Sequence, residues 1–292
     1  MMGWWVALAL AAPGHDIVPE DLFSLDVVGD VAVDEDGGRV AWVQSRWDEA
    51  ADRRVSDVWL METRARSTSR LTFDAESEGG LTFSRDGRWL YFLRTPPPPP
   101  DKGEKKDKPK AGVYRIAVDG TRLQPVTPAS MDVKGFDLPG GQGPLLVLTH
   151  GDEPVKDGFE GLRKAHDLTY GHGARKRSTV WSVDLATWRV EKLQEPGGFA
   201  YDLAGSPDGR YVATLVAPDE PLLWREGWSE VVIWDRRAGS RVPVEDTMWR
   251  AAAPSPYGWL GGLAWSSDGL ALAFEVDFDG YPGDVYAADL AG

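Results

Sequence analysis

The chain contains no cysteine, which excludes a thiolate nucleophile and makes a serine nucleophile, activated by histidine and aspartate, the first chemistry to look for. A serine hydrolase of the α/β type presents its nucleophile in a Gly-x-Ser-x-Gly turn between a strand and a helix. No such string occurs. The nearest approach is Gly227-Trp228-Ser229, where Val231 stands in place of the second glycine and is typical of a strand. The sequence therefore predicts no catalytic serine, and Ser229 is not expected to act as a nucleophile.

Metal and cofactor chemistry is not expected either. The four histidines form no H-E-x-x-H or H-x-H array that would place two imidazoles on one metal ion. No phosphate-binding glycine loop follows an expected strand. The formal net charge of −14 opposes binding to nucleic acid phosphates. We predict no metal, no cofactor and no nucleic acid partner.

The elements that would position any site are recurring β-hairpins. Each has an apolar strand, a turn of the Ser-x-Asp-Gly type and a second apolar strand, and glycine beside aspartate supplies the positive φ that tight turns need. The second strands are apolar on both faces, so we expect both faces to be covered. The four clear turns are at Asp36-Gly37, Asp86-Gly87, Asp208-Gly209 and Asp268-Gly269.

Each hairpin is followed by a third strand that starts with valine, and most are followed by a weaker fourth strand. Four short antiparallel strands per unit indicate the blade of a β-propeller. A degraded unit from Phe136 to His150, turning near Pro139-Gly140-Gly141, fills the long interval between the second and third clear turns. The predicted fold is all-β, a propeller of about five blades over residues 20–292.

The third strand of the fifth unit, Val285 to Asp289, is followed almost at once by the last residue of the sequence. The last blade is therefore expected to lack its outer strand. A propeller closes its ring by packing the last blade on the first, so this spacing favours a truncated protein. A complete five-bladed ring with one irregular blade is the alternative.

The first 14 residues resemble a signal peptide. Trp4 to Ala12 is an apolar run that ends in small residues, with Ala9-Leu10-Ala11 as a possible cleavage site. Nine residues are too few to span a bilayer, which needs about 20. We expect a periplasmic or secreted protein without a membrane span, with a cytoplasmic location as the alternative.

Two inserts interrupt the blades. Residues 96–111 begin with five prolines and continue as a charged, lysine-rich tract with nothing apolar to bury, which predicts a stiff, solvated loop. Residues 151–178 form a long polar insert rich in turn-forming residues. Long loops on a rigid scaffold are where recognition usually takes place, so the second insert is the better candidate for a functional surface.

Several motifs carry a family resemblance. Ser206-Pro207-Asp208-Gly209-Arg210 and its variants, with Arg70-Leu71-Thr72 closing a blade, resemble the N-terminal propeller of prolyl oligopeptidase family serine peptidases. Tyr170-Gly171-His172-Gly173 and Ala253 to Trp259 are similar to motifs of the dipeptidyl and acylaminoacyl peptidase branch. The Ser-Pro-Asp-Gly hairpin alone is also found in propellers of the TolB type.

The resemblance implies a propeller that admits short peptides to a C-terminal α/β-hydrolase domain carrying a Ser-Asp-His triad. That domain is not recognisable in these residues, so no catalytic residue can be assigned and activity of the chain itself is not expected. The implied partners are a peptide substrate and the hydrolase domain. The alternative is a stand-alone, protein-binding propeller of the TolB type. The residues that we expect to face the substrate cleft are Arg163, His172, Arg175, Glu226 and Trp228.

Overall fold

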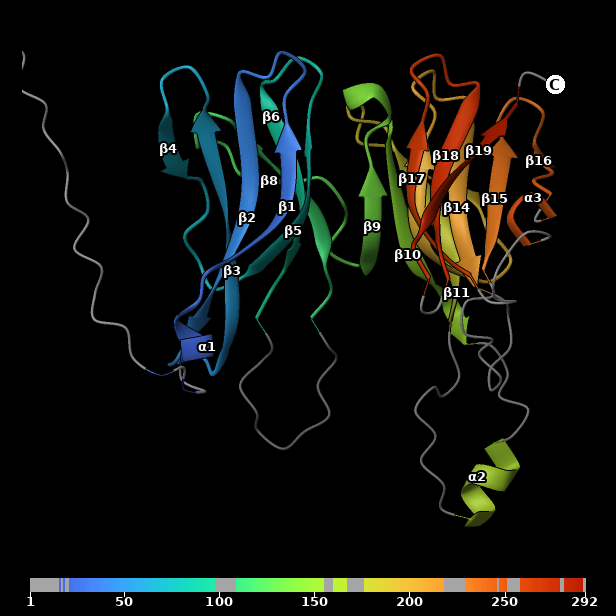
Figure 1. The fold of residues 1–292 in the computed structure, drawn as a ribbon, viewed down its shortest axis with the longest axis horizontal. Coiled ribbons are helices and arrows are strands. Elements are labelled where there is room, and N and C mark those ends of the chain that lie inside the picture. The colour runs from blue at the N-terminus through green and yellow to red at the C-terminus, as the bar shows by residue number, and fades with distance from the viewer. Residues whose placement is uncertain are drawn as a thin grey trace, which may run out of the picture.

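The computed structural model contains five antiparallel β-sheets that follow one another along the chain (Figure 1). It describes residues 16, 18, 21–97, 109–154, 160–166, 176–217, 229–245, 247–250, 258–278 and 281–290. Among these residues, four sheets have four strands and the fifth has three, and in every sheet the strands pair in sequence order. No helix in these ranges combines the length and apolar character needed to cross a membrane.

The first sheet follows α1 (Asp21–Ser24) and consists of β1 (Val27–Val33), β2 (Arg39–Asp48), β3 (Arg53–Glu62) and β4 (Ser67–Arg70). The second consists of β5 (Ser77–Phe83), β6 (Trp89–Thr95), β7 (Gly112–Ala117) and β8 (Gln124–Pro125). The third contains β9 (Val133–Asp137), the 3-10 turn η1 (Pro139–Gly141), β10 (Leu145–Pro154), α2 (Glu160–His166), β11 (Lys176–Val183) and β12 (Val190–Gln194).

The fourth sheet consists of β13 (Phe199–Gly205), β14 (Tyr211–Ala217), β15 (Glu230–Asp235) and β16 (Ser240–Val242). After α3 (Thr247–Arg250), the fifth consists of β17 (Trp259–Trp265), β18 (Ala271–Asp277) and β19 (Asp284–Asp289). The predicted blades are confirmed, including the degraded third unit and the three-stranded fifth unit. The first strands of successive sheets, β1, β5, β9, β13 and β17, are neighbours in space, as in a propeller.

The repeated turn is held by side-chain hydrogen bonds that the sequence motif encodes. In the fourth sheet, the Ser206 hydroxyl donates to Asp208 at 2.6 Å and accepts a hydrogen bond from the backbone N–H of Tyr211 at 2.8 Å. The second and fifth sheets repeat this arrangement with Ser84 and Ser266. In the first sheet, Asp34 replaces the serine, and its carboxylate accepts from the N–H of Arg39.

The core is divided into layers between successive sheets, because neighbouring residues of a strand point to opposite faces. Tyr91 and Phe92 of β6 illustrate this division. Phe92 packs with Leu60 between the first and second sheets, and Tyr91 packs with Val147 between the second and third. A fourth core layer, between the fourth and fifth sheets, includes the fully buried Trp249 of α3.

The expectation that both faces of every second strand are covered is wrong for the outermost sheets. All seven residues of β14 are buried, whereas buried and more accessible residues alternate along β18. In the first sheet, buried and more accessible residues likewise alternate over residues 40–44 of β2. The first and fifth sheets each have a neighbouring sheet of the described chain on one face only, so their outward faces remain accessible.

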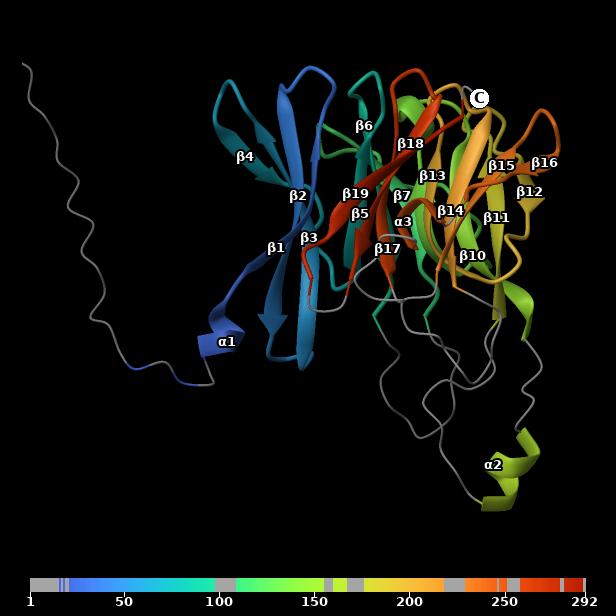
Figure 2. The ribbon, with the colours of Figure 1, turned by 45° about the vertical axis from the view of Figure 1, so that its right-hand side comes forward.

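The two ends of the sheets have different connections. The Ser-x-Asp-Gly turns and η1 lie at one end, at the top in Figures 1 and 2. The chain leaves the second strand of each sheet at the opposite end, where α1 and α2 also lie (Figure 2). The connections at this lower end range from residues 49–52 in the first sheet to residues 155–175 in the third.

Candidate functional site

The five residues expected to face a substrate cleft come from two connections at the lower end of the sheets. Arg163 lies in α2, and its side chain is outside the part that the structure describes. The other four residues, His172, Arg175, Glu226 and Trp228, also lie outside the described residues. The strands that flank these connections, β10 with β11 and β14 with β15, are paired along their length. Ser229 is buried directly before β15, and Val231 lies in β15, as expected for a strand residue.

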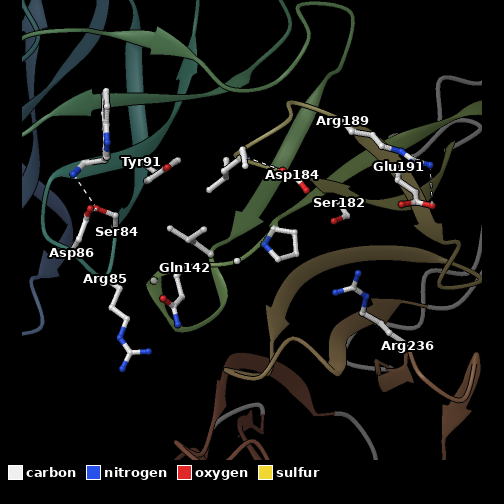
Figure 3. Close-up of a pocket in the computed structure, with 17 residues that line it drawn as sticks. Ser84, Arg85, Asp86, Tyr91, Gln142, Ser182, Asp184, Arg189, Glu191 and Arg236 are labelled. Atoms are coloured by element: carbon white, nitrogen blue, oxygen red, sulfur yellow. Dashed lines mark hydrogen bonds and ion pairs between the residues drawn. The ribbon is translucent and has the colours of Figure 1, made fainter.

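A cavity of about 690 Å³ lies at the other end of the molecule, between the turns of the second and third sheets (Figure 3). No motif in the sequence predicted it. Tyr91 lies on one side of the cavity and Ser182 on the other, while Arg236 of the fourth sheet reaches its edge. The cavity therefore collects residues from three successive sheets.

The η1 connection forms one border of this cavity. Gly140 and Gly141 adopt positive φ values of 59° and 67°, which favour glycine. The carbonyl oxygen of Gly141 accepts a hydrogen bond from the backbone N–H of Arg85 at 2.5 Å. A Cβ atom on Gly141 would lie 2.8 Å from that nitrogen, so only glycine fits this approach. The tight contact holds η1 against the turn of the second sheet.

An arginine positions the aromatic wall of the cavity. The guanidinium of Arg115 lies over the ring of Trp89 at 4.1 Å from the centroid and over the ring of Trp188 at 4.9 Å. It also donates a hydrogen bond to the buried hydroxyl of Tyr91 at 3.3 Å. Trp89 and Tyr91 both line the cavity. Cation–π contacts of this kind contribute roughly 0.5–2 kcal/mol each and hold the rings in place.

The three carboxylates that line the cavity are engaged by local partners. The Ser84 hydroxyl donates to Asp86 and keeps the pKa of that carboxyl below its usual value. Backbone N–H groups of Thr187 and Ala186 lower the pKa of Asp184 in the same way. Glu191 lies 4.0 Å from Arg189. Asp86 and Asp184 therefore stabilise their own turns, and Glu191 forms an ion pair with Arg189.

A second cluster of charges is buried between the first and second sheets. Arg94 pairs with Asp74 and with Glu76, and its Nε lies 3.5 Å from Glu78. The Glu78 side chain is 0% exposed, and neither of its oxygens has a hydrogen bond of normal geometry within the described residues. Burial, reinforced by the nearby carboxylates of Asp57 and Glu76, raises the pKa of Glu78 to about 8.

The charge cluster is a structural feature of the sheet interface. Asp57 pairs with Arg46 at 2.5 Å and with Arg70 at 2.7 Å, and its side chain is almost fully buried. Four carboxylates and three guanidinium groups therefore meet here. The raised pKa of Glu78 favours its neutral form, and a neutral Glu78 would leave three carboxylates opposite the three guanidinium groups. Within the described residues, no group of histidines and carboxylates is arranged to hold a metal ion.

Comparison with known proteins gives one curated relative and several similar structures. No family model matches the chain. An uncharacterized peptidase, YuxL of Bacillus subtilis, is 23% identical over 224 residues. The match covers 70% of this chain and 32% of that protein, so the chain spans about a third of the relative's length.

The solved structures agree on the fold. The uncomplexed acylaminoacyl peptidase of Pyrococcus horikoshii matches with a TM-score of 0.59 at 12% identity, over 91% of this chain and 39% of that chain. TolB from Acinetobacter baumannii matches with a TM-score of 0.54 at 14% identity, over 91% of this chain and 52% of that chain. The chain thus has a propeller-like fold shared with acylaminoacyl peptidase and TolB, and a sequence relative named as a peptidase confirms its resemblance to the propeller of prolyl oligopeptidase family peptidases.

Proposed function

We propose that this chain is the substrate-gating propeller of a serine peptidase of the prolyl oligopeptidase type that acts on short peptides. The observation that carries the proposal is the match to a peptidase over 70% of the chain. The fold alone is shared with TolB, so it does not distinguish a peptidase from a binding protein.

The architecture supports a gate of this kind. Stacked sheets with buried core layers form a rigid scaffold, and long connections at one end of such a scaffold commonly carry recognition. Three long connections between second and third strands, at residues 96–111, 155–175 and 218–229, leave the sheets at the lower end. In the proposed role, these connections select substrates by size, because only a short or unfolded peptide would pass between them.

In the proposed parent enzyme, an activated serine attacks the peptide carbonyl and a histidine accepts the hydroxyl proton. These groups belong to an α/β-hydrolase domain outside the 292 residues of this chain. The role proposed for this chain is therefore selection and orientation of the peptide, with Arg163, His172, Arg175, Glu226 and Trp228 facing the cleft.

The first test is translation of the genomic DNA beyond the codon for Gly292. A Gly-x-Ser-x-Gly turn followed by aspartate and histidine supports the proposal, and a stop codon with no hydrolase domain contradicts it.

The second test is kinetic and uses the full-length enzyme. Alanine at each of the five loop residues is expected to raise KM for short chromogenic peptides in at least one variant. Arg88→Ala, at the opposite end of the sheets, is the control, and unchanged kinetics in all five variants would contradict the gating role.

The second candidate function is a protein-binding propeller of the TolB type, favoured by the structural match to TolB. This alternative requires no hydrolase domain.

Both candidate functions agree with an N-terminal signal peptide over residues 1–14 and with a periplasmic or secreted location. N-terminal sequencing of the protein recovered from the periplasm or medium tests this location, and a retained Met1 in a cytoplasmic fraction would contradict it.

A further inference from the structure

The cavity between the second and third sheets has the dimensions of a ligand site. Its volume of about 690 Å³ lies within the range of small-molecule pockets, roughly 300–1,000 Å³. Trp89, Tyr91 and Leu138 supply apolar surface, and Ser182 supplies a hydroxyl that makes no hydrogen bond within the described residues. A site of this size with a few polar groups can hold a ligand as large as a tripeptide.

The charges in the cavity leave one uncommitted cation. The carboxylates of Asp86 and Asp184 accept hydrogen bonds from their own turns, and Glu191 pairs with Arg189. Arg85 lies 3.6 Å from Glu35, and in Figure 3 its side chain extends away from Ser182. Of the charged residues that line the cavity, Arg236 is the one that these interactions do not include.

Arg236 is held in place and still has donors to spare. Its Nη1 donates to the carbonyl oxygen of Gly209 at 3.0 Å, and no carboxylate of the described residues lies within ion-pair distance of it. A guanidinium has five N–H donors. In Figure 3 its guanidinium points from the edge of the cavity toward the space beside Ser182. A half-buried guanidinium with free donors beside an apolar wall is suited to an anion.

We propose that this cavity binds a small ligand with a single carboxylate, of di- or tripeptide size, anchored by Arg236. The Ser182 hydroxyl donates to the same carboxylate, and the rings of Trp89 and Tyr91, positioned by Arg115, pack against the remainder of the ligand. One uncommitted positive charge matches one carboxylate. A doubly charged phosphate would lie among Asp86, Asp184 and Glu191 with only one cation to balance it. This inference does not depend on the proposed peptidase function.

Isothermal titration calorimetry tests the proposal with trialanine, its C-terminal amide and inorganic phosphate, each at low ionic strength. Trialanine is expected to bind at least about tenfold more tightly than its amide, since the loss of a charge-assisted hydrogen bond has an effect of this size. Equal binding of the acid and the amide, tighter binding of phosphate, or no binding of trialanine would overturn the proposal.

Arg236→Gln is expected to weaken trialanine binding about tenfold or more, and Arg237→Gln is the matched control. Arg237 is an exposed neighbour that does not line the cavity, and its substitution changes the net charge by the same amount. Arg236→Lys keeps the charge without the planar fork and is expected to give an intermediate affinity. Circular dichroism melting confirms that each variant is folded. Full binding by a folded Arg236→Gln variant would overturn the assignment of this residue.

Discussion

Glu78 shows how a single buried carboxyl can make the stability of a sheet interface depend on pH. Its pKa is raised from 4.5 to about 8 by burial and by neighbouring carboxylates. In the unfolded chain, this group ionises near its ordinary pKa. At a pH between these two pKa values, Glu78 is ionised in the unfolded state and protonated in the folded state. The free energy of unfolding therefore falls as the pH rises from about 4.5 to about 8 and is constant outside this window with respect to this group.

Glu78→Gln is expected to remove this pH dependence. Within the window, the slope that disappears is roughly 1.4 kcal/mol per pH unit. The variant should consequently gain more stability relative to the wild type at about pH 8 than at about pH 5. Urea denaturation at several pH values measures the difference, with Glu35→Gln as the control because the Glu35 side chain is largely exposed. An equal change in stability at both ends of the window would contradict the assignment.

Individual site residues were harder to predict from the sequence than the fold. The five loop residues proposed for the substrate cleft were selected by residue type within long loops, and they remain predictions. The cavity at the turn end was missed because it depends on contacts between strands that are distant in sequence. Arg115 meets Tyr91 and Trp188 only through the pairing of β6 with β7 and the packing of the third sheet. A single sequence contains no local signal for contacts between residues that lie this far apart along the chain.

At the scale of elements, the turns carried most of the information. Asp-Gly dipeptides located four hairpins because the φ requirement and the serine hydrogen bonds are local. The weak fourth strand of the first sheet begins a few residues earlier than expected. The expected Arg70-Leu71-Thr72 strand is β4 at Ser67–Arg70, where pairing with β3 sets the limits. Register of this kind depends on the partner strand, which local composition does not specify.

Gly141→Ala is expected to destabilise the protein and distort the cavity. The new Cβ would lie 2.8 Å from the backbone nitrogen of Arg85, in addition to the strain of a positive φ of 67°, which costs roughly 1–2 kcal/mol. Gly143→Ala is the matched control, since Gly143 has a positive φ of 92° and no atom lies within 4 Å of the position that its Cβ would occupy. Denaturant unfolding should show a greater loss for Gly141→Ala, and equal losses would contradict the importance of the contact with Arg85.

At the scale of the whole molecule, the outward faces of the first and fifth sheets carry exposed apolar side chains. Val31 is 62% exposed on β1 and Val285 is 76% exposed on β19. The stacked rings of Trp42 and Trp59 lie on the first sheet, with centroids 6.2 Å apart. Exposed apolar side chains on a sheet face without a neighbouring sheet promote association in water.

We expect the 292-residue chain to self-associate in a concentration-dependent manner. Val31→Lys and Val285→Lys should each shift the equilibrium toward the monomer, because a charge on an apolar contact face must be desolvated. Sedimentation velocity over a range of concentrations measures the shift. Leu123→Lys, in the connection between β7 and β8, adds the same charge elsewhere and is the control. A chain that stays monomeric at every concentration would contradict this expectation.

The separation of short turns at one end from variable connections at the other makes the scaffold suitable for grafting. The upper turns are fixed by serine and aspartate hydrogen bonds, so added residues there would break the pairing of two strands. At the lower end, connections as different as residues 49–52 and 155–175 join strands of similar sheets. A foreign peptide or a fluorescent reporter placed in residues 49–52 should therefore leave β2 and β3 paired. The fold is therefore suited to the display of inserted peptides, because the structure of its sheets does not depend on the length of these connections.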